Sequence, residues 1–222
     1  MGKIRIAIDG PAGAGKSSIA KIISSKLQIK YLDTGAMYRT VALKAIRSDI
    51  NTLDRKKIAE MISDINIKVV FDNDTQRMYL DDEDVTGLIR TKDVTVGSSN
   101  VATIPEVRHK LVELQREIAR ENGIVMDGRD IGTYVLPDAE VKIYLNASSD
   151  ERALRRYKEM VANGDTTVSL EAIKKDIEYR DMNDSTRKMA PLKKADDAVE
   201  IDTTNMTINE VVEKIISIIR KL

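Results

Sequence analysis

Cysteine and tryptophan are absent from the 222 residues, and histidine and phenylalanine occur once each. Without cysteine there is no disulfide framework, no thiolate zinc site and no cysteine nucleophile. The single histidine, His109, leaves little material for a histidine metal site or a serine–histidine pair. The chemistry of this chain must therefore rest on other residue types.

Long apolar runs and an excess charge of one sign are also missing. No apolar stretch reaches about 18 residues, so we expect no membrane-spanning helix, and no signal-peptide run opens the chain. With the lack of cysteine, this predicts a cytoplasmic protein. Lys plus Arg number 36, as do Asp plus Glu. We therefore expect no nucleic-acid or membrane partner, and any anion site must be a local gathering of Arg and Lys. Nothing demands more than a monomer.

Short apolar segments alternate with amphipathic helical patterns along most of the chain. We expect strands at residues 4–8, 29–32, 123–127, 141–145 and 199–202. Helices are expected after Gly15, over residues 36–47, and after three Ser or Thr residues with Glu three positions later, as in a capping box: Thr103, Ser148 and Thr207. Strands that alternate with helices predict an α/β fold of three layers, with a central parallel sheet.

One segment breaks this alternation. Residues 67–71 and 76–80 predict the two strands of a β-hairpin with its turn at residues 72–75, and no crossover helix fits between them. We therefore predict a β-containing inserted subdomain over residues 62–102. The core domain then comprises residues 1–61 and 103–222.

The phosphate-binding loop motif G-x-x-x-x-G-K-[ST] is present in full, between an expected strand and an expected helix. Its glycines let backbone N–H groups turn toward a phosphate, and the helix dipole favours the same anion. Lys16 is expected to reach the β- and γ-phosphates of ATP, and Ser17 to bind Mg²⁺. The predicted ATP-binding residues are Gly10, Pro11, Ala12, Gly13, Ala14, Gly15, Lys16, Ser17 and Ser18.

Two further clusters follow expected strands, where open α/β sheets bind their ligands. The first, residues 31–39, places Arg39 to hold a second phosphate. The second begins with Asp127, a carboxylate suited to hold Mg²⁺ through water, and continues with Arg129 and Asp130. Such polar residues directly behind a buried strand indicate function rather than packing.

A third cluster consists of arginines near the C-terminus. Arg152, Arg155 and Arg156 share one face of a predicted helix, and Arg180 and Arg187 follow. Runs of charge usually mark a solvated helix face. Phosphoryl transfer, however, needs guanidinium groups against the equatorial oxygens of the moving phosphate, so we interpret this series as functional.

The sequence resembles the bacterial-type cytidylate kinases, a branch of the phosphate-loop nucleoside monophosphate kinases. The resemblance covers nearly the whole chain and rests on residues 8–16, 32–39, 87–91, 127–133 and 187–192. The string Asp-Gly-Arg-Asp-Ile-Gly-Thr at residues 127–133 and the large insert are specific to that family. It implies transfer of a phosphoryl group from ATP to CMP or dCMP with Mg²⁺.

The resemblance also implies roles for individual residues. A lid over about residues 152–165 would carry Arg152, Arg155 and Arg156 to the ATP phosphates. Thr34, Arg108 and Asp130 would face cytosine, and Ser99, Arg180 and Asp184 the ribose. Arg39, Arg129 and Arg187 would hold the CMP phosphate, and Asp33 and Tyr38 would also bind the substrate. The catalytic residues would be Lys16, Asp127, Arg129, Arg156 and Arg187.

Two departures and two alternatives remain. Ser17-Ser18 stands where the family often has Gly-Thr or Ser-Thr, and Thr34 where Ser is common; the hydroxyl groups persist. A kinase of the same architecture could act on AMP, UMP or shikimate. A phosphate-loop switch or ATPase would instead hydrolyse ATP without an acceptor, although no Asn-Lys-x-Asp guanine motif is present.

Overall fold

The computed structural model of the chain describes residues 3–72, 75–162, 164 and 167–221. Its centre is a five-stranded sheet in the order β2-β6-β1-β7-β8, and all four strand pairs are parallel. This confirms the predicted α/β sheet. The strands are β1 (Arg5–Asp9), β2 (Lys30–Asp33), β6 (Ile124–Gly128), β7 (Val141–Asn146) and β8 (Val199–Asp202).

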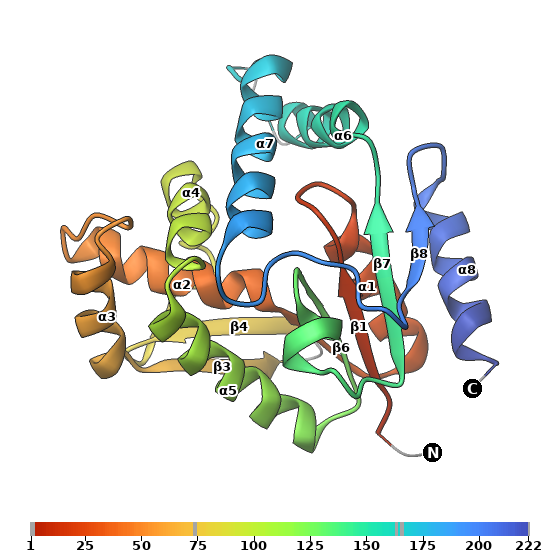
Figure 1. Cartoon of the computed structure of the whole chain (residues 1–222), viewed down its shortest axis with the longest axis horizontal. Coiled ribbons are helices and arrows are strands. Elements are labelled where there is room, and N and C mark those ends of the chain that lie inside the picture. Colours follow the sequence, from red (N-terminus) through yellow and green to blue (C-terminus); the bar gives the residue numbers. More distant parts are fainter. Residues whose placement is uncertain (1–2, 73–74, 163, 165–166, 222) are drawn as a thin grey trace.

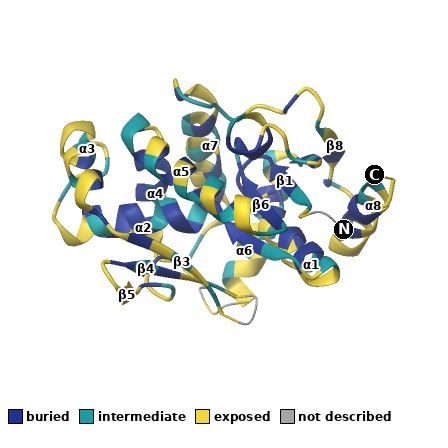
Figure 2. Cartoon of the chain, turned by 90° about the horizontal axis from the view of Figure 1, so that it is seen from below, coloured by how far each residue is buried: buried dark blue, intermediate teal, exposed yellow. Residues whose placement is uncertain are grey.

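Helices cover both faces of this sheet (Figure 1). Successive residues of a strand point to opposite faces, so Ala7 joins one core cluster while Ile6 and Ile8 join the other. The first cluster includes α2 (Thr34–Arg47) and α5 (Pro105–Glu121). The second includes α1 (Lys16–Leu27) and α8 (Ile208–Ile219). The central strands are accordingly buried (Figure 2).

The segment that breaks the alternation forms a separate antiparallel sheet. Strands β3 (Ile67–Asp72) and β4 (Thr75–Leu80) pair as a hairpin, as predicted, and β5 (Glu83–Asp84) adds a short third strand. Residues 73 and 74 of the predicted turn lie outside the described residues. Helix α3 (Arg55–Asp64) precedes this sheet, and α4 (Lys92–Val101) follows it and packs along α2.

Two helices lie beyond the carboxyl ends of the strands (Figure 1). They are α6 (Ser149–Ala162) and α7 (Leu170–Thr186), which pack against each other. The predicted lid, about residues 152–165, occupies most of α6, and its residues 163 and 165 lie outside the described residues. None of the described helices is long and apolar enough to cross a membrane.

The helix starts test the three expected capping boxes. Thr207 forms a complete box with Glu210 at the start of α8. The Ser148 hydroxyl accepts from the Glu151 N–H at 3.2 Å, but the Glu151 side chain binds Arg155 instead of completing the box. The box at Thr103 is wrong, because α5 begins one residue later, after Ile104, and the Thr103 hydroxyl donates to the carbonyl of Asn100.

Candidate functional site

Three aspartates stand where adjacent parallel strands end. Asp9 ends β1 and Asp33 ends β2, while Asp127 is the penultimate residue of β6. The strand register places Asp33 opposite Asp127 and Asp9 opposite Gly128. A cavity of about 910 Å³ opens at this edge of the sheet. Its volume is at the upper end of the range for small-ligand pockets, about 300–1,000 Å³.

The cavity gathers most of the predicted site residues, although they come from distant parts of the chain. It is also lined by an excess of positive charge, ten Lys and Arg against six Asp and Glu, in a chain of zero net charge. The predicted residues that line it are Gly13, Ala14, Gly15, Lys16, Ser17, Ser18, Asp33, Thr34, Tyr38, Arg39, Ser99, Arg108, Asp127, Arg129, Asp130, Arg156, Arg180, Asp184 and Arg187.

The loop between β1 and α1 has the backbone that its glycines predict. Gly10 has φ +146°, and a Cβ there would lie 2.0 Å from the carbonyl oxygen of Leu145, so no other residue fits. Gly15, at φ 84°, is the N-cap residue of α1, and it has no side chain that could cap the helix. The first N–H groups of α1 therefore stay available for an anion. Lys16 Nζ donates to the carbonyl of Pro11 at 2.6 Å.

Asp127 faces Ser17 across the floor of the cavity. Its two carboxylate oxygens accept from the Ser17 hydroxyl at 2.7 Å and from the Tyr31 hydroxyl at 2.9 Å. Burial raises the pKa of Asp127, and the neighbouring charge of Asp33 raises it further. A cation beside this carboxylate would relieve both effects. The hydroxyl of Ser17 and the carboxylate of Asp127 thus fit a hard metal ion in both chemistry and position.

Arginines from separate elements hold carboxylates around the cavity. Arg39 of α2 pairs with Asp33 at 2.6 Å, and Arg129, after β6, pairs with Asp184 of α7 at 2.7 Å. The Arg39 Nε is buried and has no hydrogen-bond partner among the described residues. Such an orphaned donor costs free energy that an acceptor on a ligand can recover.

Arg180 of α7 differs from these arginines because it has no ion-pair partner within 4 Å among the described residues. Burial lowers its pKa to about 10, and the nearby charge of Arg129 contributes. Burial also lowers the pKa of Lys16, again with Arg129 as the next cause. The loop lysine and these arginines therefore share one repulsive positive field, which a polyanion would neutralise.

A second group lies deeper in the cavity. Asp130 accepts from Arg108 through one oxygen and from Arg187 at 3.0 Å through the other. Arg108 is 1% exposed, its Nε has no hydrogen-bond partner among the described residues, and its guanidinium lies 5.7 Å from the centre of the Tyr38 ring. A buried carboxylate and a buried donor beside an aromatic ring can together bind a flat polar ring.

Four of the predicted residues do not line the cavity. Gly10, Pro11 and Ala12 form the buried base of the loop, and Arg152 packs behind it. Arg152 donates to the carbonyl of Ala12 at 2.7 Å and to Asp181 at 2.6 Å. The next arginines of α6, Arg155 and Arg156, do line the cavity. Arg152 therefore supports the loop from behind.

Arg90 also lines the cavity and lies 3.5 Å from Asp33, although the sequence motifs predicted no role for it. A signal was present, since residues 87–91 already formed one of the motifs of the resemblance. No motif in the sequence indicated the contact of Asp181 with the loop, because this contact depends on how α7 packs.

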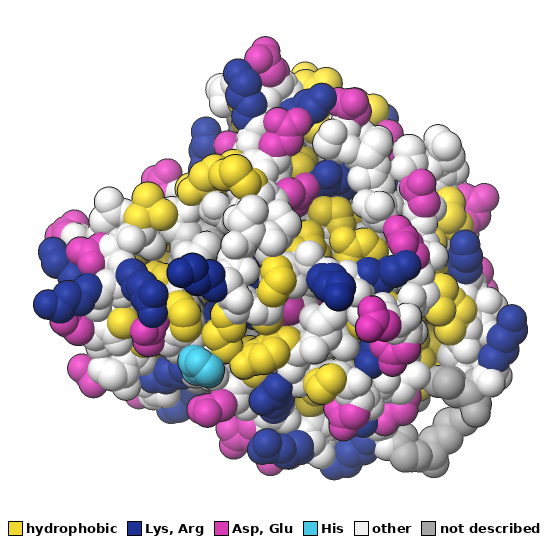
Figure 3. All heavy atoms as spheres, in the orientation of Figure 1, with side chains coloured by type: hydrophobic (Ala, Val, Ile, Leu, Met, Phe, Trp, Pro, Cys, Tyr) yellow, Lys and Arg dark blue, Asp and Glu magenta, His cyan; other side chains and the backbone are white. Residues whose placement is uncertain are grey.

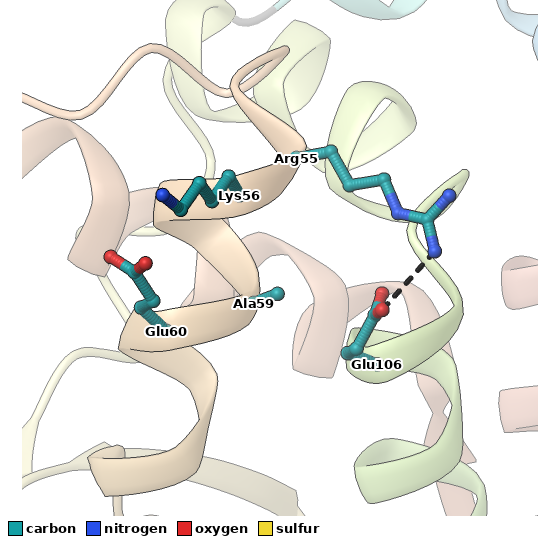
Figure 4. A pocket seen from close by; sticks show the side chains of 5 residues that line it. All are labelled: Arg55, Lys56, Ala59, Glu60 and Glu106. Carbon is teal, nitrogen blue, oxygen red and sulfur yellow. Dashed lines mark hydrogen bonds and ion pairs between the residues drawn. The ribbon is translucent and has the colours of Figure 1, made fainter.

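A second hollow lies between α3 and α5, about 530 Å³ in volume (Figure 4). Its lining includes Arg55, Lys56 and Glu60 of α3 and Glu106 of α5, and Arg55 pairs with Glu106 at 3.1 Å. This hollow is lined by charges of both signs, whereas the large cavity has a clear excess of positive charge. The face of the molecule in Figure 3 likewise shows side chains of both signs intermixed.

Comparison with known proteins gives the family. The sequence profile of the cytidylate kinases matches residues 6–221. The chain belongs to the cytidylate kinase family. A cytidylate kinase from Pediococcus pentosaceus is 54% identical over 217 residues, which cover 98% of this chain and 96% of that protein. One from Caldicellulosiruptor saccharolyticus is 48% identical over 222 residues, which cover 100% and 98%.

A solved structure shares the fold at low sequence identity. An uncharacterized protein from Eubacterium ventriosum aligns with a TM-score of 0.55 and 14% identity, over 99% of each chain. This likeness concerns the fold alone. The cytidylate kinase family assignment rests on the sequence relatives and on the profile match.

Proposed function

We propose that this chain transfers the γ-phosphoryl group of ATP to CMP, and to dCMP, with ADP and CDP or dCDP as products. The observation that carries the proposal is the cavity itself. It begins at a complete phosphate-binding loop and continues into a lining of ten cations against six acids, with Arg180 unpaired among the described residues. Membership of the cytidylate kinase family supports CMP as the acceptor.

The donor nucleotide binds at the loop. The N–H groups that follow Gly15 and the ammonium group of Lys16 hold the β- and γ-phosphates, for which the Pro11 carbonyl must release Lys16. Ser17 and Asp127 would hold Mg²⁺, together with phosphate oxygens and water, as this ion prefers. When bound, Mg²⁺ neutralises phosphate charge. Among the described residues no cluster of three or more acidic or histidine side chains offers a rival site.

The acceptor nucleotide binds in the deeper half of the cavity. Asp130 and Arg108 suit the cytosine ring, since Asp accepts from the N4 amino group and Arg donates to the ring acceptors. Arg39, Arg129 and Arg187 hold the phosphate of CMP, while Ser99, Arg180 and Asp184 hold the ribose. Thr34 adds a hydroxyl at the same wall, where it donates to the carbonyl of Asp127 at 2.7 Å.

The reaction needs no strong base, because the attacking oxygen of the CMP phosphate is already anionic. That oxygen forms a bond to the γ-phosphorus as the bond to the bridging oxygen of ADP breaks. The protein aligns the two phosphates and neutralises their repulsion. Lys16 and the arginines supply this positive charge, and Arg156 adds to it from α6. Exclusion of water by the lid then prevents loss of the phosphoryl group by hydrolysis.

A panel of acceptors tests the proposal. With ATP and Mg²⁺, a coupled assay for ADP should give rapid turnover with CMP and dCMP and much slower turnover with AMP, UMP or shikimate. Omission of the acceptor should leave only slow ATP hydrolysis, and removal of Mg²⁺ with EDTA should abolish the reaction. Equal turnover without any acceptor would identify a switch or ATPase instead. A preference for another acceptor would refute the cytosine assignment.

A further inference from the structure

The side chain of Asp181 reaches the phosphate loop from behind. Its Oδ1 accepts from the backbone N–H of Ala12 at 2.9 Å, and its Oδ2 accepts from Arg152 at 2.6 Å. The same Arg152 nitrogen donates to the carbonyl of Ala12 at 2.7 Å. One acid–base pair thus holds both polar groups of Ala12, and thereby fixes the two peptide planes beside it.

This clamp is largely shielded from solvent. Ala12 is 1% exposed, and the side chains of Arg152 and Asp181 are 8% and 22% exposed. Ala12 also packs with Ala153 of α6 and with Ile173 and Ile177 of α7. Charge-assisted hydrogen bonds at such a site are stronger than those in water. The loop geometry therefore depends on where α6 and α7 sit.

Helix α7 also carries groups that face the proposed acceptor site. Asp184 holds Arg129, and Arg180 lines the same cavity. On another side of the helix, Asn183 donates to the Ser99 hydroxyl at 3.2 Å and Tyr179 donates to Asn100 at 2.9 Å, both on α4. One rigid helix thus contacts the donor loop through Asp181 and the acceptor-side residues through its other faces.

We infer that Asp181 is a positioning residue that fixes the phosphate loop for ATP and couples it, through α7, to the acceptor site. Asp181 does not touch substrate. Binding of CMP to Arg129 and Arg180 fixes the position of α7. This fixes the side chain of Asp181, which in turn fixes the N–H groups of the loop. Each nucleotide should therefore tighten the binding of the other, and by linkage the two factors must be equal. The inference rests on the proposed function only in that the loop binds ATP and the arginines bind CMP.

The test is Asp181→Asn, which keeps the size of the side chain. An amide can still accept from Ala12, but its NH₂ group faces Arg152 and cannot accept. We expect the Kd of a non-hydrolysable ATP analogue with Mg²⁺, measured by calorimetry, to rise about tenfold, as for loss of one charge-assisted hydrogen bond. The Kd of CMP alone should stay within about twofold. The tightening of either nucleotide by the other should disappear.

Two further variants separate positioning from stability. Arg152→Lys keeps the charge but loses the planar guanidinium group that donates to both Asp181 and Ala12, and should give the same pattern as Asp181→Asn. Asp176→Asn changes an exposed carboxylate of α7. It should match the wild type in the Kd of each nucleotide, measured alone and with the other nucleotide bound. Thermal unfolding should show that each variant is folded at the assay temperature.

The outcomes are distinct. Unchanged ATP affinity and unchanged coupling in Asp181→Asn would overturn the inference and leave the proposed function intact. Equal weakening of ATP and CMP, with a lowered unfolding midpoint, would show a merely structural role and would also overturn it. A wild-type chain that fails to bind the ATP analogue would refute both. Binding and coupling of the two nucleotides without phosphorylation of CMP would refute only the proposed function.

Discussion

At the residue scale, several cations that face the cavity are hydrogen-bonded or ion-paired to oxygens of the protein itself. Lys16 donates to the Pro11 carbonyl at 2.6 Å, Arg39 pairs with Asp33, and Arg187 pairs with Asp130. These contacts satisfy the hydrogen-bonding and charge requirements of buried cations. A phosphate that binds here, as proposed, must replace or share these contacts, so part of its binding free energy is spent on the exchange.

Asp9 is a buried acid that has no ion pair with any cation in the part of the chain that the structure describes. Its two oxygens accept from the backbone N–H groups of Ile131 at 2.8 Å and Gly132 at 2.7 Å, in the turn directly after Asp130. Burial raises the pKa of Asp9 to about 7, although the two N–H groups act in the opposite direction. The end of β1 thus holds the turn that presents Arg129 and Asp130.

We predict a pH-dependent contribution of Asp9 to stability. Because its pKa in the folded chain lies above the ordinary value of 3.8, the folded chain holds more protons than the unfolded chain between those two values. The free energy of unfolding should therefore fall as pH rises toward 7, by up to about 1.4 kcal/mol per pH unit, and level off above. Urea denaturation of wild type and Asp9→Asn at pH 5, 6, 7 and 8 measures this. A difference between the two proteins that stays constant over this range would contradict the prediction.

At the scale of elements, the sequence pattern predicted strands and hairpin well but helix starts less well. The runs of apolar residues at 4–8 and 123–127 are each within one residue of β1 and β6, because a fully buried strand needs little else. Three identical-looking capping boxes had three outcomes. Tertiary contacts decided them: Arg155 takes the Glu151 side chain, and Thr103 turns back to the helix before it.

In the site, too, the groups at strand ends were predicted better than the side chains on helices. The phosphate loop and Asp127 were predictable, because a strand end followed by a motif fixes where each group must lie. The arginines of α6 were expected on one face, yet Arg152 is buried behind the loop while the side chain of Arg156 is 45% exposed. Helical spacing gives the angle between side chains but not the neighbour that each one meets.

The complete capping box on α8 leads to a stability prediction. Thr207 accepts from the Glu210 N–H at 3.3 Å, and the Glu210 side chain accepts from the Thr207 N–H at 2.7 Å. Thr207→Ala should lower the free energy of unfolding by about 1 kcal/mol, within the usual range of about 0.5–2 for a lost cap. Urea denaturation checks this. Ser217→Ala, at an exposed position of the same helix, is the matched control and should change it little; equal losses in both variants would exclude a capping effect.

At the scale of the whole molecule, a neutral chain concentrates positive charge at one place. The cavity lies where the core sheet, α4, α6 and α7 meet, and it receives cations from α1, α2, α5, α6 and α7. Among the cations that line it, the side chains of Arg90, ahead of α4, and Arg156 of α6 are 62% and 45% exposed. Exposed side chains on two separate elements come closer to a common ligand if those elements move together.

We therefore predict that the chain contracts when both nucleotides bind. Two polyanions between the walls draw Arg90 and Arg156 inward, and α6 moves toward the sheet. By small-angle X-ray scattering, the radius of gyration should fall toward about 17 Å, the value for a compact chain of this length, with CMP and a non-hydrolysable ATP analogue together. Either nucleotide alone should give a smaller change, because the repulsion between the arginines and Lys16 is then only partly neutralised. A radius that is the same with and without both ligands would mean that the cavity is already closed, and that Arg156 acts from where it now lies.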